Sequence, residues 1–422
     1  MKKWVFYLLL VLITIGCRRK DGKIEFSCPG KEKEIVFWHA MGGPLGETLE
    51  SLVNDFTKQY PKYKIRLVNC GNYNALSQKV MASLAAKNTP TIAQVFPTQV
   101  AVMIKSDRIH RLDEMPNANL VIKRTFPVLI RENTWNDQLW SIPFNKSVQV
   151  VYYNVEEFKK NGLKPATSWT EFDQLVDKLT RKDENGKTLR YGLGMSLSTW
   201  TFQNFLSLAG GELLDKDGNP QFHNETGIKT LSFLLNLIHK KKTAKVLEGF
   251  EIQNEFLAGN IGMVLGSCAS YSFMKQISRF KLGVFHLPAD KKALTIVSGT
   301  NIVLFKGKPA DQTEGAWRFL EWLTEPKQSV KWSMATSYAP LNPECFQDKE
   351  YLEYLDKIPG LKDAYLTMQN GDMEPRFSFW VDGRKILSDH LEKCLIKEDA
   401  DPKKELTEAA QEISAIKERE SK

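Results

Sequence analysis

Apolar residues in the first quarter of the chain recur with the spacing of strands that alternate with helices. Short apolar runs at residues 35–38, 63–68 and 91–96 each predict a buried strand. Between them, residues 45–56 and 76–84 carry apolar side chains at helical spacing, and Pro61 ends the first of these helices. This alternation of strands and helices predicts a parallel α/β sheet.

A second α/β pattern follows, and the first pattern then returns. Residues 148–154 predict a long apolar strand, after which Ser168 and Glu171 predict the capped start of a helix. Strand-like runs reappear between residues 280 and 305. We therefore predict two lobes, each built from two parts of the chain: residues 35–145 with 281–327, and residues 148–278 with 330–400. Residues 401–422 predict a polar C-terminal helix with a modest apolar stripe at Leu406, Ala410 and Ile413.

The N-terminus has a different pattern. Two lysines precede an apolar run over residues 4–15, and Gly16-Cys17 precedes an abrupt change to charged residues. A basic start, an apolar run too short to span a bilayer and a small residue before a polar stretch are typical of a cleaved export signal. We expect a signal peptide at 1–16, a flexible tether at 17–34 and a location outside the cytoplasm. A plain signal peptide and an uncleaved anchor are the alternatives.

Cys17 stands at the predicted cleavage point and resembles the lipidated cysteine of bacterial lipoproteins. The resemblance implies a lipid on Cys17, which would hold the mature protein at the membrane surface. It is imperfect, because Thr14 stands where this signal usually has leucine.

Composition indicates a globular protein with more than one domain. The chain has 422 residues, of which 42% are hydrophobic and 26% charged, and no later apolar run approaches bilayer length. The net charge of +8 falls to +6 once Lys2 and Lys3 leave with the signal. Such a mild excess is typical of a solvated lysine-rich surface, so we expect no nucleic-acid partner.

The motifs of common enzymes are missing. The sequence has no G-x-S-x-G elbow, no G-x-x-x-x-G-K-[ST] phosphate loop and no H-E-x-x-H. Its six histidines include no pair at metal-ligand spacing, and its six cysteines are too widely spaced for a zinc site or a disulfide scaffold. We therefore expect no enzyme activity, no metal and no cofactor. Carboxylates are numerous enough that an exported hydrolase of carbohydrates or phosphodiesters stays the alternative.

Several segments, in order, resemble the solute-binding proteins of bacterial ABC importers, in the maltose-binding-like group and most closely in its glycerol-3-phosphate-binding branch. They include residues 34–41, 56–61, 71–73, 88–95, 143–147, 152–154 and 159–169, with looser matches up to residues 337–340. The similarity implies a type II periplasmic-binding-protein fold, with a ligand cleft at the hinge between two α/β lobes. It also implies a monomer that delivers a sugar, a polyol or a glycerophospho-compound to permease subunits.

The resemblance also implies ligand-binding residues at positions that match the family's motifs. Arg384 aligns with an arginine that grips a phosphate, which suits the paired donors of a guanidinium. Trp200 lies near a pocket tryptophan and would offer a stacking surface, although a core position fits it equally well. The other residues implied are Tyr73, Ser147, Ser267, Ser270, Gly299 and Tyr338.

One position departs from the family's pattern. The acidic residue that would hold glycerol hydroxyls is replaced by Pro97, which offers neither a side-chain acceptor nor a backbone donor. The identity of the ligand is therefore open.

Overall fold

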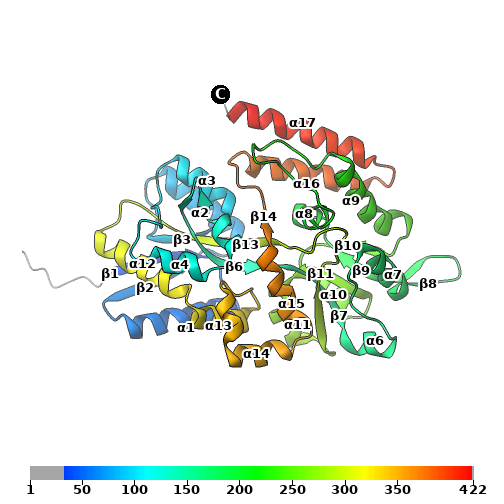
Figure 1. The fold of residues 1–422 in the computed structure, drawn as a ribbon, viewed down its shortest axis with the longest axis horizontal. Coiled ribbons are helices and arrows are strands. Elements are labelled where there is room, and N and C mark those ends of the chain that lie inside the picture. Colours follow the sequence, from blue (N-terminus) through cyan, green and yellow to red (C-terminus); the bar gives the residue numbers. More distant parts are fainter. Residues whose placement is uncertain (1–32, 421–422) are drawn as a thin grey trace, which may run out of the picture.

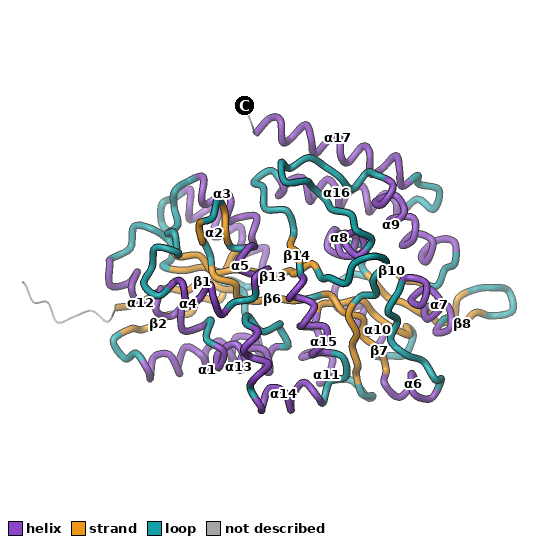
Figure 2. The backbone as a smooth tube through the Cα atoms, in the orientation of Figure 1, coloured by secondary structure: helices purple, strands orange, loops and turns teal. Residues whose placement is uncertain are grey.

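The computed structural model describes residues 33–420, and these form two α/β lobes. The predicted signal peptide at 1–16, Cys17 and all but the last two residues of the predicted tether lie outside the described residues. Among those described, no helix has the length and apolar character that a membrane span requires. Figure 2 shows the strands gathered at the centre of each lobe, with helices around them.

The first lobe is built on a six-stranded sheet of order β14-β13-β3-β1-β2, with β6 also paired to β13. β1 is parallel to both β2 and β3, as the alternating pattern predicts, whereas β13 runs antiparallel to β3 and β6. Its strands are β1 (Lys33–His39), β2 (Tyr63–Asn69), β3 (Ile92–Val95), β6 (Ile142–Ser147), β13 (Ile296–Leu304) and β14 (Asp372–Met373).

Helices cover this sheet with their apolar faces. In the first helix, Leu49, Leu52, Val53 and Phe56 are all buried, so its helical spacing is explained by packing on the sheet. A small hairpin of β4 (Thr134–Trp135) and β5 (Gln138–Leu139) adjoins them. The helices are α1 (Gly43–Gln59), α2 (Tyr73–Ala85), α3 (Pro97–Lys105), α4 (Ala118–Arg124), α5 (Pro127–Glu132), α12 (Ala310–Leu323) and α13 (Pro326–Thr336).

The second lobe has its own six-stranded sheet, of order β10-β9-β11-β7-β12 with β8 paired to β9. It is mixed: β9 is parallel to β10 and β11, whereas β7 is antiparallel to β11 and β12. Its strands are β7 (Gln149–Asn154), β8 (Arg181–Lys182), β9 (Thr188–Met195), β10 (Ala244–Val246), β11 (Ile261–Ser267) and β12 (Leu282–His286).

A cap fixes the start of one helix of the second lobe where the sequence predicts it. Ser168 accepts a hydrogen bond from the backbone N–H of Glu171 at 3.2 Å and so begins α7 (Trp169–Leu179). The other helices are α6 (Val155–Lys160), α8 (Thr199–Leu208), α9 (Glu225–Leu235), α10 (Gly249–Leu257), α11 (Tyr271–Ile277), α14 (Lys349–Asp356) and α15 (Leu361–Leu366).

Two long C-terminal helices complete the second lobe (Figure 1). They are α16 (Trp380–Ile396) and α17 (Pro402–Glu420), which pack on each other, and α17 also packs on α9. The predicted stripe of Leu406, Ala410 and Ile413 is buried in the same core cluster as Trp380 and Leu387. The last helix is therefore an integral part of the lobe.

For three segments, the lobe in the structure differs from the lobe to which the predicted boundaries assign them. β12 lies within the predicted range 281–327 of the first lobe, yet it pairs with β7 of the second sheet. The helix α13 extends into the range 330–400 assigned to the second lobe, but Lys331 bonds Asp55 of α1 at 2.6 Å. β14, at residues 372–373, joins the first sheet through β13. Pairing and packing between segments far apart in the sequence, which hydrophobic spacing does not encode, decide these assignments.

Candidate functional site

The two sheets are joined most directly at the end of β6, where Val148 alone separates it from β7. The predicted residues Ser147 and Gly299 both lie at this hinge, because Ser147 pairs with Ser298 and Lys146 pairs with Gly299 on β13. Gly299 has φ +128°, and a Cβ atom there would stand 1.7 Å from the carbonyl oxygen of Asn145. The glycine therefore lets β13 approach β6 closely, a steric role that a ligand need not share.

Tyr73 and Tyr338 meet beside the hinge. Their hydroxyl oxygens are 3.1 Å apart, and the Asn145 amide donates to the Tyr73 hydroxyl at 3.2 Å. Asn72 caps α2 by accepting from a backbone N–H at 2.9 Å, which sets Tyr73 on the first turn just beyond β2. Burial raises the pKa of Tyr338 well above its ordinary value, and the neighbouring Tyr73 raises it further. The Tyr338 hydroxyl therefore stays protonated at neutral pH, and it can donate or accept a hydrogen bond.

Sequence reasoning did not single out Asn145, although it lies in a quoted motif. Its side-chain nitrogen contacts the sulfur of Met41 at 3.0 Å as well as the Tyr73 hydroxyl, and its side-chain oxygen Oδ1 is buried without a partner. Buried polar atoms are nearly always hydrogen-bonded, so an open acceptor beside two tyrosines is suited to a polar solute or an ordered water.

Three other predicted residues line one hollow in the second lobe, of about 150 Å³. Ser267 accepts from the backbone N–H of Ala269 at 3.2 Å, and Ser270 accepts from the Gln253 side chain at 3.2 Å. Trp200, on the first turn of α8, donates its indole N–H to the carbonyl of Ile296 at 2.9 Å. The residues lining this hollow include Trp200, Ser267, Ser270, Gln149, Ser198 and Gln253.

Unpartnered polar atoms gather near the hinge. Besides Asn145, the side-chain carbonyl oxygens of Gln149 and Gln203 and both polar atoms of Asn301 are buried without a partner. These residues come from β6, β7, α8 and β13, the elements that meet where the lobes join. Leaving several such groups unpaired costs about 1–3 kcal/mol each, so this region favours a polar occupant.

Arg384 lies on α16 and is not among the residues that line the hollow of Trp200. Its guanidinium forms an ion pair with Glu374 at 3.0 Å, and its side chain is 45% exposed. The structure therefore leaves Arg384 within reach of solvent but already beside a carboxylate.

Pro97 is the first residue of α3, where its fixed φ suits a helix start. The preceding Phe96 packs its ring against Tyr73, with centroids 5.5 Å apart. This edge of the first lobe is aromatic where the resemblance implies a carboxylate.

A buried ion pair also lies at the hinge and was not predicted. Lys146, in β6, bonds the carboxylate of Glu132 from α5, and both side chains are almost completely inaccessible to solvent. Burial lowers the pKa of Lys146, and the attraction of Glu132 offsets part of that effect. Because lysine and glutamate are mostly surface residues, nothing in their local sequence signals this pairing.

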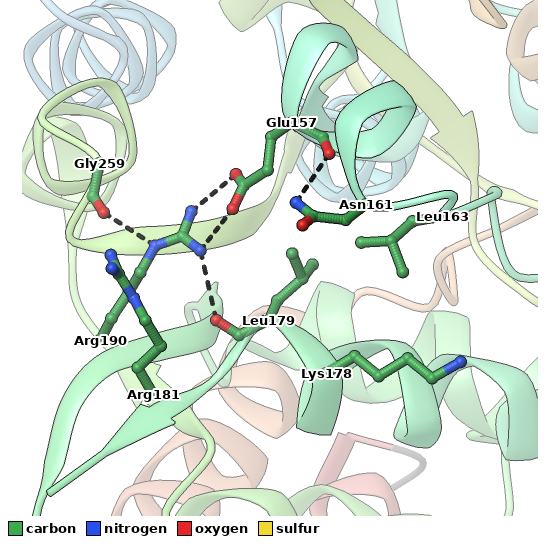
Figure 3. Close-up of a pocket in the computed structure, with 8 residues that line it drawn as sticks. All are labelled: Glu157, Asn161, Leu163, Lys178, Leu179, Arg181, Arg190 and Gly259. Atoms are coloured by element: carbon green, nitrogen blue, oxygen red, sulfur yellow. Dashed lines mark hydrogen bonds and ion pairs between the residues drawn. The ribbon is translucent and has the colours of Figure 1, made fainter.

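Another hollow, of about 480 Å³, lies elsewhere in the second lobe (Figure 3). It is lined by residues such as Lys178, Arg181 and Arg190. Arg190 bonds both carboxylate oxygens of Glu157, at 2.6 and 2.8 Å, and also the carbonyls of Leu179 and Gly259 (Figure 3). Four of its five N–H donors are thus taken up by the protein, and Arg190 ties together α6, α7 and the loop before β11.

Residues 33–420 contain one group of potential metal ligands and four free cysteines. His390, Glu405 and Glu408 lie close enough to share a metal ion, but Lys393 stands 3.4–3.5 Å from both ring nitrogens of His390 and supplies the positive charge there. Within the same range, Cys70, Cys268, Cys345 and Cys394 are free thiols.

Comparisons with known proteins agree with this architecture. Residues 51–357 match the family described as "Bacterial extracellular solute-binding protein". The sn-glycerol-3-phosphate-binding periplasmic protein UgpB of Salmonella typhimurium is 28% identical over 353 residues, which cover 80% of each chain. The corresponding Escherichia coli K12 protein is 27% identical over the same length.

Solved structures of binding proteins share the fold. UgpB from Mycobacterium tuberculosis, in complex with glycerophosphocholine, has a TM-score of 0.81 at 23% identity, covering 92% of this chain and 99% of its own. The maltose/maltodextrin-binding domain MalE from Bdellovibrio bacteriovorus, bound to maltotriose, has a TM-score of 0.75 at 20% identity, covering 92% of this chain and all of its own. The two lobes thus form the type II periplasmic-binding-protein fold, as the sequence predicts.

Proposed function

This chain belongs to the family of bacterial extracellular solute-binding proteins, and we propose that it captures a sugar, a polyol or a glycerophospho-compound for an ABC importer. The observation that carries the proposal is the polar lining of the hinge region. Asn145 of the tyrosine and asparagine cluster lies in β6, and Gln149 of the serine and tryptophan hollow lies in β7, and Val148 alone separates these two strands. A solute held between lobes in this way is enclosed by both.

The chemistry of this lining favours a ligand rich in oxygen. The hydroxyls of Tyr73, Tyr338, Ser267 and Ser270 can each donate or accept, which matches the hydroxyl groups of a sugar or a glycerol unit. The indole of Trp200 adds an apolar surface for a ring or a choline group. Arg384 adds a donor for a phosphodiester. The relatives named above bind glycerol-3-phosphate, glycerophosphocholine or maltotriose, so each of these compound classes is a candidate here.

Closure of the lobes over the solute is the step that would signal occupancy to the permease. The links between the two sheets, of which Ser147 to Gln149 is the shortest, are suited to such a hinge motion because they concentrate the backbone change in a few residues. Binding then shifts the equilibrium towards the closed form by the difference between the ligand's binding free energies for the closed and open forms.

The location outside the cytoplasm follows from the family. The lipid anchor, the tether and the monomeric state are part of this proposal. We propose that Cys17 carries a lipid, that the tether predicted at residues 17–34 links it to the lobes and that the protein acts as a monomer. Mass spectrometry of the N-terminus of protein expressed in a bacterium would show a diacylated Cys17. A mature N-terminus at any other residue would overturn this part.

Absence of catalysis is also part of the proposal, since the relatives are binding proteins and not hydrolases. Incubation with glycerophosphocholine or maltose should leave both compounds intact. Release of product that a single carboxylate substitution abolishes would instead favour the hydrolase.

Thermal unfolding tests the binding function. Protein freed of co-purified solute by unfolding and refolding is heated with maltose, glycerol-3-phosphate and glycerophosphocholine in turn. A ligand at 100 times its dissociation constant stabilises the folded state by about 2.7 kcal/mol, which gives a clear upward shift of the midpoint. A flat response to all such solutes would count against the proposal.

A further inference from the structure

The proposed phosphate-binding arginine is not an isolated positive charge. Glu374 Oε1 forms an ion pair with Arg384 Nε at 3.0 Å and accepts a hydrogen bond from the indole N–H of Trp380 at 3.1 Å. The side chains of Glu374 and Arg384 are 25% and 45% exposed, so both charged groups can be reached by a solute. Any phosphate that binds Arg384 therefore meets a carboxylate beside it.

The backbone holds Glu374 close to the other candidate residues. It directly follows β14, which pairs with β13 at Ile296, and the carbonyl of Ile296 accepts the indole N–H of Trp200 at 2.9 Å. The carbonyl of Met373 accepts from the side chain of Gln203 at 3.0 Å. Glu374 is thus fixed next to the first turns of α8 and beside a strand of the hinge. Figure 1 shows β14 between the two lobes, with the chain rising from it to α16.

The charges of this pair cancel. Arg384 contributes +1 and Glu374 contributes −1, whereas the acidic residue that the family resemblance places on the first lobe is absent because position 97 is proline. A dianionic ligand such as glycerol-3-phosphate gains from the guanidinium but is repelled by the adjacent carboxylate. A zwitterionic phosphodiester can place its phosphate at the arginine and its cation at the carboxylate. A neutral sugar can donate a hydroxyl to the carboxylate and accept from the guanidinium.

We propose that Glu374 is a ligand-binding residue that selects solutes of zero net charge, whether zwitterionic or neutral, against anionic ones. The proposal rests on the solute-binding function given above. In this site Glu374, which directly follows β14, replaces the carboxylate that Pro97 cannot supply.

Isothermal titration calorimetry with three probes tests this selection: glycerol-3-phosphate, glycerophosphocholine and maltose. In Glu374→Gln the glutamine can still accept from Trp380 but has no charge, so repulsion of the dianion disappears. We expect the affinity for glycerol-3-phosphate, relative to glycerophosphocholine, to rise at least about tenfold, the equivalent of about 1.4 kcal/mol. If maltose is the only probe that binds the wild type, we expect its affinity to fall at least threefold, because a charged acceptor is lost.

A matched control removes a carboxylate elsewhere. Glu398→Gln breaks a surface pair with Lys242, at 3.7 Å, and should leave every affinity unchanged. Circular dichroism checks that each variant is folded, and Glu374→Ala serves as the second variant if the glutamine is not. The selection by Glu374 is overturned if the ratio of the affinities for glycerol-3-phosphate and glycerophosphocholine changes less than threefold in Glu374→Gln. It is also overturned if this ratio changes equally in Glu398→Gln. Wild-type protein that binds none of a wider set of sugars and glycerophosphodiesters would instead overturn the binding function itself.

Discussion

The ion pair between Lys146 and Glu132 is the most demanding electrostatic feature of the hinge. The Lys146 side chain is fully buried and that of Glu132 is 3% exposed, and Lys146 lies in β6 between the site residues Asn145 and Ser147. An ammonium group removed from water is stable in the interior only when an opposite charge lies against it. The strand that carries the site residues therefore depends on this pair.

Glu132→Gln should destabilise the protein by about 3–5 kcal/mol, because it leaves the Lys146 ammonium buried without a counter-charge. The double variant Lys146→Met with Glu132→Gln should recover most of this loss, since no charge then remains in the interior. Urea denaturation, with unfolding free energies extrapolated to water, measures both effects. Asp389→Asn, which breaks the exposed pair with Lys385, is the matched control and should change stability little.

The pH dependence makes the prediction sharper. Burial lowers the pKa of Lys146 in the folded protein, and Glu132 offsets part of that lowering, so the variant lowers this pKa further. Between the folded pKa and the unfolded value near 10.4, the unfolded chain binds more protons, and stability rises with pH. The loss in unfolding free energy that Glu132→Gln causes, relative to the wild type, should therefore become smaller as the pH is raised from 7 towards 10. A loss below about 1 kcal/mol at pH 7, or a deficit that does not change with pH, would refute this reasoning.

Four further predictions concern the hinge, the site and the buried His39 of β1. Gly299→Ala should cost about 2 kcal/mol or more in urea denaturation, because its φ of +128° and the nearby carbonyl leave no room for a methyl group. Arg384→Ala should weaken a bound glycerophosphodiester by at least about 1.5 kcal/mol in calorimetry, and an unchanged affinity would remove this arginine from the site. Tyr338→Phe should weaken the same ligand by about 0.5–1.5 kcal/mol through its lost hydroxyl, with an unaltered fold by circular dichroism. Burial lowers the pKa of His39 to about 4. Since the unfolded chain then binds more protons between pH 6.5 and 4, the protein should lose up to about 3 kcal/mol of stability as the pH falls through this window. The variant His39→Asn should flatten that part of the pH profile of stability, measured by urea denaturation.

Local spacing was enough to predict the strands and helices that bury one apolar face. The stripe of α1 and the cap at Ser168 are both present where the sequence places them. The C-terminal stripe at Leu406 is buried as well. In each case the signal and the packing lie within one element, so no knowledge of partners was needed.

Contacts between distant segments were not predictable in this way. β12 has an ordinary strand pattern, and only its pairing with β7 shows to which lobe it belongs. Glu374 and Lys146 resemble surface residues in the sequence, because their importance comes from Arg384 and Glu132 placed beside them by the fold. The position of Tyr73 was implied by resemblance, while its hydrogen bonds with Tyr338 and Asn145 required the structure.

The most direct test of solute binding is a calorimetric titration of refolded, solute-free protein with glycerophosphocholine, glycerol-3-phosphate and maltose. The account predicts saturable binding of at least one of them with a stoichiometry near one. It also predicts that the double variant Tyr73→Phe with Tyr338→Phe, folded by circular dichroism, weakens that binding, because both hydroxyls lie at the hinge. Heat changes no larger than dilution for every solute, or an affinity that the double variant leaves unchanged, would contradict it.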